Sequence, residues 1–239
     1  MLERVLKVAF MLAMAVFLFT RVSGNTILYY INDRFVGLTL LAAAGFLVLA
    51  VGIWFATDSA DGAGQALALG RVSWGGLLLV SLPVLLGVIV TPRPLGAAAL
   101  SNREVSLESL TSVALQERTA VLRASERTVL DWLIEFQRAD NPADLSGQEA
   151  QVIGFVYRDS RFTDDTFMAG RFIVSCCVAD ADPIGLIVQS ADAGQFAEDQ
   201  WLEIRGAFQM GTFDGQETPL LIATEINPVD PPAQPYLYP

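Results

Sequence analysis

Histidine is absent from the 239-residue chain, and its only two cysteines, Cys176 and Cys177, are adjacent. Without histidine the chain has no Ser–His–Asp or Cys–His catalysis, no imidazole proton transfer near neutral pH and no histidine-containing zinc site. Two adjacent cysteines build no disulfide framework, so cysteine usage does not indicate the redox compartment. These absences leave few routes to enzymatic chemistry and make the cysteine pair the main chemical candidate.

Lysine is confined to Lys7, and charge of either sign is scarce in the first 100 residues. Residues 1–100 hold six basic and four acidic side chains, whereas residues 101–239 hold nine basic and 22 acidic ones. An apolar half is therefore joined to an acidic half, which excludes a simple soluble globule and a disordered chain. Nucleic-acid binding is not expected, because it needs clustered Lys and Arg and the acidic half has no lysine.

Three long apolar runs, at about 5–21, 35–56 and 72–91, predict three transmembrane helices in a membrane domain over residues 1–100. The first run could instead be a cleaved signal peptide, but no small-residue cleavage site stands out after it. No run carries an acidic residue in its middle, and an ion path normally needs intramembrane ionisable groups. We therefore expect a multi-pass protein of the plasma membrane that contacts the lipid bilayer and forms no pore alone.

The side of the membrane that carries the C-terminal half follows from the number of spans. Arg4 before the first run and Lys7 near its start favour an N-terminus on the cytoplasmic side. Three spans would then place the C-terminal domain on the extracytoplasmic side.

A helical linker is expected over residues 101–140, after a proline-rich boundary at 91–96. Apolar residues recur there at helical spacing, and Ser125 is suited to cap a helix that begins at Glu126. This helix could dock on a partner, form a stalk or pack on its own domain. Asn141 and Pro142 end the helical pattern.

Residues 141–239 change to short alternating runs that predict five strands, at 149–157, 167–175, 185–189, 201–208 and 218–226. Between the third and fourth runs lie enough residues for about one helical turn. Five short strands with a helical connection after the third match a small OB-like barrel. Gly154 and Gly206 suit the bulged positions that such a barrel needs. The fold class is thus membrane α plus soluble β.

Thiols and carboxylates gather where the second predicted strand ends: Cys176 and Cys177 precede Asp180 and Asp182. Thiolates bind soft and borderline metals, and a carboxylate can complete such a site, so Cys176, Cys177 and Asp180 are candidate ligands for a zinc or copper ion. Adjacent residues on a strand point to opposite faces, so the two sulfurs converge only if the strand breaks there. Otherwise one cysteine is buried and the other faces the turn. A structural cysteine or a strained vicinal disulfide are the alternatives.

A charged residue interrupts the second predicted strand at Arg171. We expect this side chain to be solvated or to pair with one of the acidic turns, because charged groups are seldom fully buried.

The sequence resembles the YcgQ-like family of bacterial permease subunits. The residues that carry the resemblance are 152–157, Phe167, 171–174, 176–180, 201–206, Pro232 and 235–238. The resemblance implies a small membrane subunit that works with a separate multi-spanning permease subunit. It also places Cys176 where some relatives have histidine, an alternation that a metal ligand would tolerate.

These observations favour an accessory subunit of a bacterial membrane permease, whose OB-like domain gates or recognises a solute or metal ion. A first alternative is a membrane-anchored metal- or thiol-dependent enzyme that uses Cys176 and Cys177. A second is a membrane-anchored protein-interaction module. An enzyme is not the first expectation, because Asp180 and Asp182 would raise a neighbouring thiol pKa and so oppose a reactive thiolate.

Overall fold

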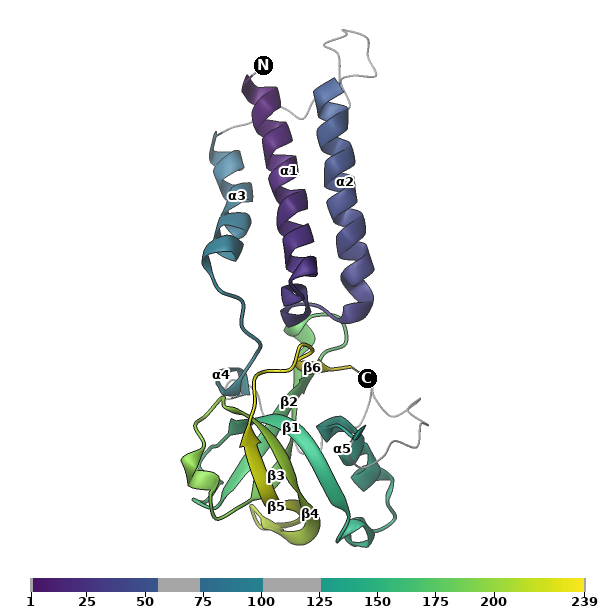
Figure 1. Cartoon of the computed structure of the whole chain (residues 1–239), viewed down its shortest axis with the longest axis vertical. Coiled ribbons are helices and arrows are strands. Elements are labelled where there is room, and N and C mark those ends of the chain that lie inside the picture. The colour runs from purple at the N-terminus through teal and green to yellow at the C-terminus, as the bar shows by residue number, and fades with distance from the viewer. Residues whose placement is uncertain (1, 56–73, 101–125, 239) are drawn as a thin grey trace. The chain divides into compact units, whose positions relative to one another are not determined.

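A computed structural model describes residues 2–55, 74–100 and 126–238 of the chain. The chain divides into two compact units, Met1–Arg93 and Pro94–Pro239. The first unit is helical, and the second is built around a sheet (Figure 1). Most of the expected linker helix, including the Ser125 cap, lies outside the described residues.

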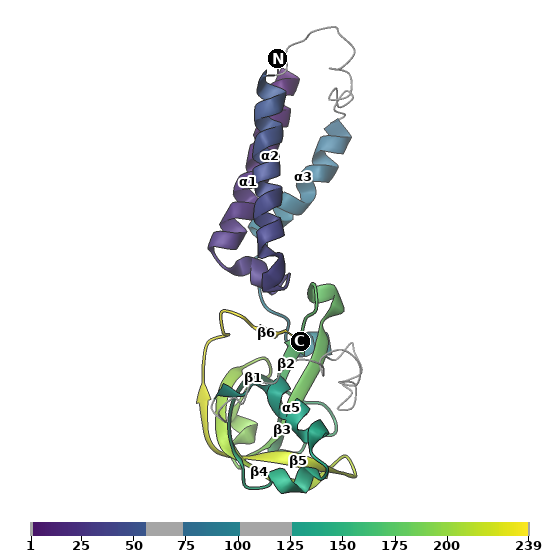
Figure 2. The ribbon, with the colours of Figure 1, turned by 90° about the vertical axis from the view of Figure 1, so that its right-hand side faces the viewer.

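Three α-helices and two short 3-10 turns make up the first unit: α1 (Leu2–Ser23), η1 (Thr26–Tyr29), η2 (Asp33–Phe35), α2 (Val36–Phe55) and α3 (Trp74–Ile89). Helices α1 and α2 pack side by side (Figures 1 and 2). Ala15 on α1 and Ala43 and Ala50 on α2 are buried, as expected of small side chains that let two helices approach closely. Arg21, near the end of α1, donates a hydrogen bond to the carbonyl of Gly87 in α3.

Two of these helices are long and apolar enough to cross a membrane. They are Arg4–Ser23, with 20 residues, and Asp33–Phe55, with 23. Their apolar side chains face outward, as Leu41, Val48 and Phe55 illustrate with 68%, 70% and 74% exposure. The third expected span, 72–91, begins outside the described residues, and α3 has 16 residues against the roughly 20 that a span needs. The described residues thus contain two apolar helices of membrane length.

A six-stranded sheet forms the second unit. Its strands are β1 (Glu149–Tyr157), β2 (Thr166–Ile173), β3 (Asp182–Gln189), β4 (Trp201–Phe213), β5 (Gln216–Pro228) and β6 (Tyr236–Leu237). Their order is β1-β4-β5-β3-β2-β6, and β1 also pairs with β2. The pairs β3–β5 and β2–β6 are parallel, and the others are antiparallel. Strand β1 has the expected bounds, whereas β6 was not expected.

Close backbone contact requires glycine at one point of the β4–β5 ladder. The register shifts between Arg205 and Gly206, which marks a bulge. A Cβ atom at Gly206 would collide with the backbone carbonyl of Ile222 on β5. The bulge expected at Gly206 is therefore present, and the tight approach of the two strands depends on it.

Helix α5 (Val129–Arg138) packs against the sheet (Figure 2), inside the unit that begins at Pro94. Its buried Trp132 and Phe136 both lie 4.8 Å from the ring of Phe208 on β4, measured between ring centroids. Thr128 and Asp131 form a capping box, so the helix begins at Val129 and not at Glu126 as expected. The described part of the expected linker is thus part of the folded domain.

Arg171 on β2 is buried, with 6% exposure, and not solvated as expected. It donates to three backbone carbonyls, those of Ile153, Gln234 and Pro235, and lies over the ring of Trp201 at 5.2 Å. No carboxylate among the described residues pairs with it. Burial lowers its pKa to about 10. The expected pairing with an acidic turn is wrong, because the carbonyls of the C-terminal tail supply the partners instead.

Candidate metal centre

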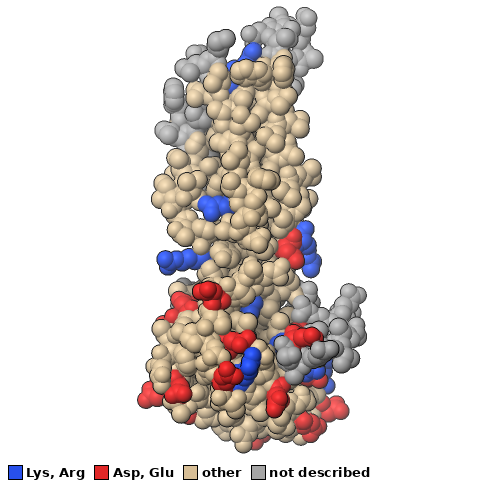
Figure 3. All heavy atoms as spheres, viewed as in Figure 1, with Lys and Arg blue, Asp and Glu red and all other residues tan. Residues whose placement is uncertain are grey.

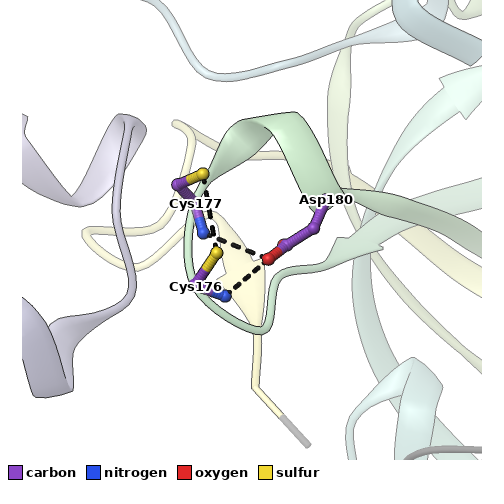
Figure 4. Close-up of side chains that lie close together, drawn as sticks. All are labelled: Cys176, Cys177 and Asp180. Carbon is purple, nitrogen blue, oxygen red and sulfur yellow. Dashed lines mark hydrogen bonds between the residues drawn. The ribbon is translucent and has the colours of Figure 1, made fainter.

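Cys176, Cys177 and Asp180 lie together in the loop between β2 and β3 (Figure 4). Strand β2 ends at Ile173, and a single 3-10 turn, η7 (Val178–Asp180), precedes β3. Antiparallel pairing of β2 with β3 up to the Ile173–Asp182 register fixes the two ends of the loop. The three side chains are therefore carried by a short connection whose ends are held by the sheet.

The sulfur atoms of the two cysteines are 3.7 Å apart, and both thiols are free. Because β2 ends two residues before the strand predicted from sequence, the cysteines do not alternate across the sheet. Cys176 is exposed and Cys177 is half-buried. The sequence predicts one buried and one turn-facing cysteine if the strand continues unbroken through both residues. The strand ends before them, so this prediction is wrong. A purely structural role as buried apolar side chains does not fit this exposure.

The carboxylate of Asp180 binds the backbone of the same loop. Its Oδ1 accepts the N–H of Ser175 at 3.0 Å, and its Oδ2 accepts the N–H of Cys176 at 2.8 Å and of Cys177 at 3.4 Å. Burial opposes ionisation of Asp180, but hydrogen bonds from the Cys176 thiol and from these backbone groups outweigh it and lower its pKa. An ionised Asp180 thus fixes the backbone of the two residues that carry the thiols.

The thiol of Cys176 is a poor nucleophile in this setting. Its hydrogen bond to Asp180, followed by that to Cys177, raises its pKa to about 11. At neutral pH the group is therefore almost entirely protonated, and the thiolate is the form that attacks an electrophile. Without histidine in the chain, no imidazole can take the proton. The raised pKa therefore disfavours covalent catalysis by Cys176, and a metal ion bound by this thiol would have to displace its proton.

The ligand atoms of Cys176, Cys177 and Asp180 all lie within 4.8 Å of one another. No other group of three metal-ligating side chains comes together in the described parts of the chain. Two sulfurs and one oxygen form a donor set that borderline metals such as zinc accept. The structure thus brings together all three of the residues predicted as ligands.

The surface charge of the sheet unit and a small hollow in it limit the ligands that this unit can recognise. On the face shown in Figure 3, Asp and Glu side chains gather over the sheet unit, whereas the helices carry few charged groups. A small hollow of about 200 Å³ lies between α5, β3 and β5 and is lined mainly by apolar residues such as Leu133, Phe136 and Ile187. The cysteine loop does not line this hollow. The hollow therefore offers the metal-ligating loop no adjoining substrate pocket.

Sequence reasoning missed two contributors to this region. The N–H of Ser175 is a backbone group, and no side-chain pattern marks it as a donor to Asp180. The N–H of Val174 donates to the carbonyl of Leu237 at 2.9 Å, so the tail strand β6 braces the start of the loop. The aromatic and proline residues of the tail were the available signal, but a two-residue strand is too short to stand out.

The fold and the loop together define a protein that joins apolar helices of membrane length to a six-stranded sheet domain with a two-cysteine cluster. The DUF1980 C-terminal domain matches residues 109–239, more than half of the chain, and the chain belongs to this family. The cysteine loop lies inside the matched region.

A curated relative is the UPF0703 protein YcgQ of Bacillus subtilis (strain 168), which is 23% identical over 99 residues. That match covers 41% of this chain and 35% of the relative, so only about a third of the relative's length is represented. Both findings confirm the predicted resemblance to a YcgQ-like family. No solved structure matches the chain.

Proposed function

We propose that this chain is an accessory subunit of a bacterial membrane permease, held in the plasma membrane by its helices and recognising a solute or metal ion with its sheet domain. The observation that carries the proposal is the outward-facing apolar surface of the first unit. Side chains such as Leu41, Val48 and Phe55 on α2 are more than two-thirds exposed and need lipid or another helix to cover them.

A multi-spanning partner is supported by the lack of charge in α2 and α3. Helix α2 has no Asp, Glu, Lys or Arg from Val36 to Phe55, and α3 has none from Trp74 to Ile89. Transport paths through a membrane are normally marked by ionisable groups inside the spans. The helices of this chain therefore supply an anchor and a docking surface, and the path itself belongs to the partner.

The proposal includes a third span at about 72–91 and a C-terminal domain on the extracytoplasmic side. The sequence run of 20 uncharged residues supports the span, although α3 covers only part of it. Arg4 and Lys7 support an N-terminus on the cytoplasmic side. An odd number of spans then puts the cysteine loop outside the cytoplasm.

The proposal also treats the sheet domain as an OB-like barrel. Support comes from the pairing pattern, in which β1 contacts both β4 and β2 while β5 bridges β4 and β3. The strands can then be followed as a ring in the order β1-β2-β3-β5-β4, with β6 outside it. OB folds bind ligands on the face of strands 2 and 3 and with the loops beside it, and the cysteine loop joins those two strands.

An alternative, a membrane-anchored thiol enzyme, is disfavoured by the chemistry of Cys176. A thiol with a pKa of about 11 and no histidine nearby lacks the thiolate that such an enzyme uses. The metal-binding role of the loop is retained as the recognition function of the subunit.

Co-purification tests the subunit role. The full chain, tagged at its C-terminus, is extracted from native membranes in mild detergent, and the eluted proteins are identified by mass spectrometry. We expect one multi-spanning membrane protein in stoichiometric amount. Elution of the chain alone from well-solubilised membranes would overturn the proposal.

Matched variants on α2 locate the contact. A Cβ atom at Gly45 would meet nothing within 4 Å, so Gly45→Leu leaves the helical unit itself intact and blocks only a helix that docks there. Ala43 is buried, so Ala43→Leu disturbs the packing of the unit instead. Loss of the partner in Gly45→Leu, with thermal stability unchanged, places the partner on the outer face of α2.

A further inference from the structure

We propose that Cys176 and Cys177 chelate one borderline divalent cation of the zinc class, with Asp180 as third ligand and the fourth position open to solvent. The inference rests on the proposed function and deepens it, because it names the metal ion that the sheet domain would recognise. It is carried by the geometry of the loop and not by the family resemblance.

The spacing of the two sulfurs fits the bite of a tetrahedral ion. Zinc–sulfur bonds of about 2.3 Å at a tetrahedral angle place two sulfurs about 3.8 Å apart. The sulfurs of Cys176 and Cys177 are 3.7 Å apart. A linear two-coordinate ion with the same bond length would need about 4.6 Å, and a disulfide about 2.0 Å. The pair thus has the spacing of a bent chelate, which is also the spacing of the S–H···S hydrogen bond between the two thiols.

Asp180 can act as a ligand without giving up its hold on the loop. Its Oδ1 accepts the N–H of Ser175, and a carboxylate oxygen has two lone pairs and so has room for a second partner. Tetrahedral coordination places a carboxylate oxygen about 3.6 Å from each sulfur, so ligand atoms already within 4.8 Å of one another must close by about 1 Å. The three ligand side chains are small, so no bulky group among them opposes this closure.

The number of protein ligands distinguishes a site that exchanges a ligand from a structural site. Structural zinc sites are closed by four protein ligands, whereas sites that exchange a ligand keep one position open. Here three side chains converge, and Cys176 and Asp180 are both exposed. Binding forms two metal–sulfur bonds and one metal–oxygen bond, and each thiol gives its proton to the buffer. Such a site can accept an ion from solution and release it to a partner that supplies the fourth ligand.

Zinc binding by the full chain in detergent tests the inference. The reduced, chelator-washed protein is titrated with Zn²⁺ against a chromophoric chelator, and Co²⁺ is added separately to read thiolate-to-cobalt charge transfer. We expect one ion per chain, with loss of binding and of the charge-transfer band in Cys176→Ser and in Cys177→Ser. Asp180→Asn should weaken Zn²⁺ binding by more than about 10-fold, because changes to outer-shell partners alone cost about 10–100-fold.

Asp182→Asn is the matched control, because Asp182 is an exposed carboxylate two residues away that is not in the cluster. It should bind as the wild type does, and circular dichroism checks that every variant keeps its sheet. Wild-type protein that is folded and reduced yet takes up no Zn²⁺ would overturn the inference. Equal binding by a Cys176→Ser/Cys177→Ser double variant would also overturn it.

The metal and subunit proposals fail separately. If the double serine variant still co-purifies with a multi-spanning partner, the subunit role stands whatever the metal titration shows. If the wild type binds one Zn²⁺ but elutes alone from membranes, the metal site stands and the subunit role falls.

Discussion

The backbone N–H of Cys176 donates to the carboxylate of Asp180 at 2.8 Å, within the loop that joins β2 to β3. The same carboxylate accepts the N–H groups of Ser175 and Cys177, so one acidic side chain orders three consecutive residues. Three backbone donors around one carboxylate are an arrangement that stabilises its charged form. The relationship has two consequences: these hydrogen bonds hold the backbone of the loop, and the adjacent thiol feels a fixed negative charge.

The first prediction concerns the pH at which Cys176 reacts. The pKa of Cys176 is raised to about 11, first by its hydrogen bond to Asp180, so the neutral thiol persists through pH 9 and the thiolate appears only above that. In a Cys177→Ser background, where Cys176 is the only cysteine, Asp180→Asn removes the charge and should move the reactive midpoint toward lower pH. The rate of iodoacetamide alkylation against pH, in metal-free protein, measures this midpoint.

The control for that measurement is Asp182→Asn in the same background, because it removes a nearby charge that does not touch the thiol. It should leave the midpoint almost unchanged. A midpoint near pH 9 in the Cys177→Ser protein that does not move when Asp180→Asn is added would contradict the assigned contact.

The second prediction concerns the bulge in β4. Gly206→Ala should destabilise the sheet unit by about 1–3 kcal/mol, because the added methyl group collides with the carbonyl of Ile222 and overpacks the ladder. Gly194→Ala is the matched control, since its Cβ would lie 3.6 Å from the nearest atom, an ordinary contact. Urea unfolding of the full chain in detergent, followed by circular dichroism, compares the two. Equal stability of the two variants would show that the strands can separate at Gly206 without cost.

The sequence predicted most of this architecture where its periodicity was strong. Strand β1 has the bounds that alternation indicated, and the apolar runs at 5–21 and 35–56 correspond to α1 and α2. The strand β6 was missed because two residues between prolines carry no periodicity, and its place depends on a parallel pairing with β2. Short pairings of distant segments are set by tertiary contacts, which local patterns do not encode.

The sequence predicted which residues form the candidate site but not how they are arranged. The thiol and carboxylate types at 176, 177 and 180 indicated a metal donor set, but the convergence of the sulfurs depends on β2 ending at Ile173. In this loop the hydrogen bonds that Asp180 accepts compete with the strand ladder and set the end of β2. Because β2 ends two residues earlier than predicted, the two cysteines do not point to opposite faces of the sheet. The prediction for Arg171 is wrong for a similar reason, because two of the three carbonyls that accept its hydrogen bonds come from residues more than 60 positions away.

The third prediction concerns the side of the membrane that carries the cysteine loop. With three spans and a cytoplasmic N-terminus, a C-terminal alkaline phosphatase fusion should be active and a C-terminal green fluorescent protein fusion dark, because each reporter works on only one side. Fusions after Arg93, which ends the first unit, serve as the matched pair and should report the same side. The opposite pattern at both points would contradict the topology of three spans with a cytoplasmic N-terminus.

The fourth prediction concerns the buried guanidinium that holds the C-terminal tail. Arg171→Met removes three hydrogen bonds and leaves the carbonyls of Ile153, Gln234 and Pro235 without that donor, so the sheet unit should lose about 3 kcal/mol of stability. The tail should also become sensitive to carboxypeptidase, because β6 is only two residues long. Arg205→Met is the matched control: this arginine is half exposed, and its ion pairs contribute about 0–1 kcal/mol. Equal urea midpoints and equal digestion of the two variants would show that the tail is held without Arg171.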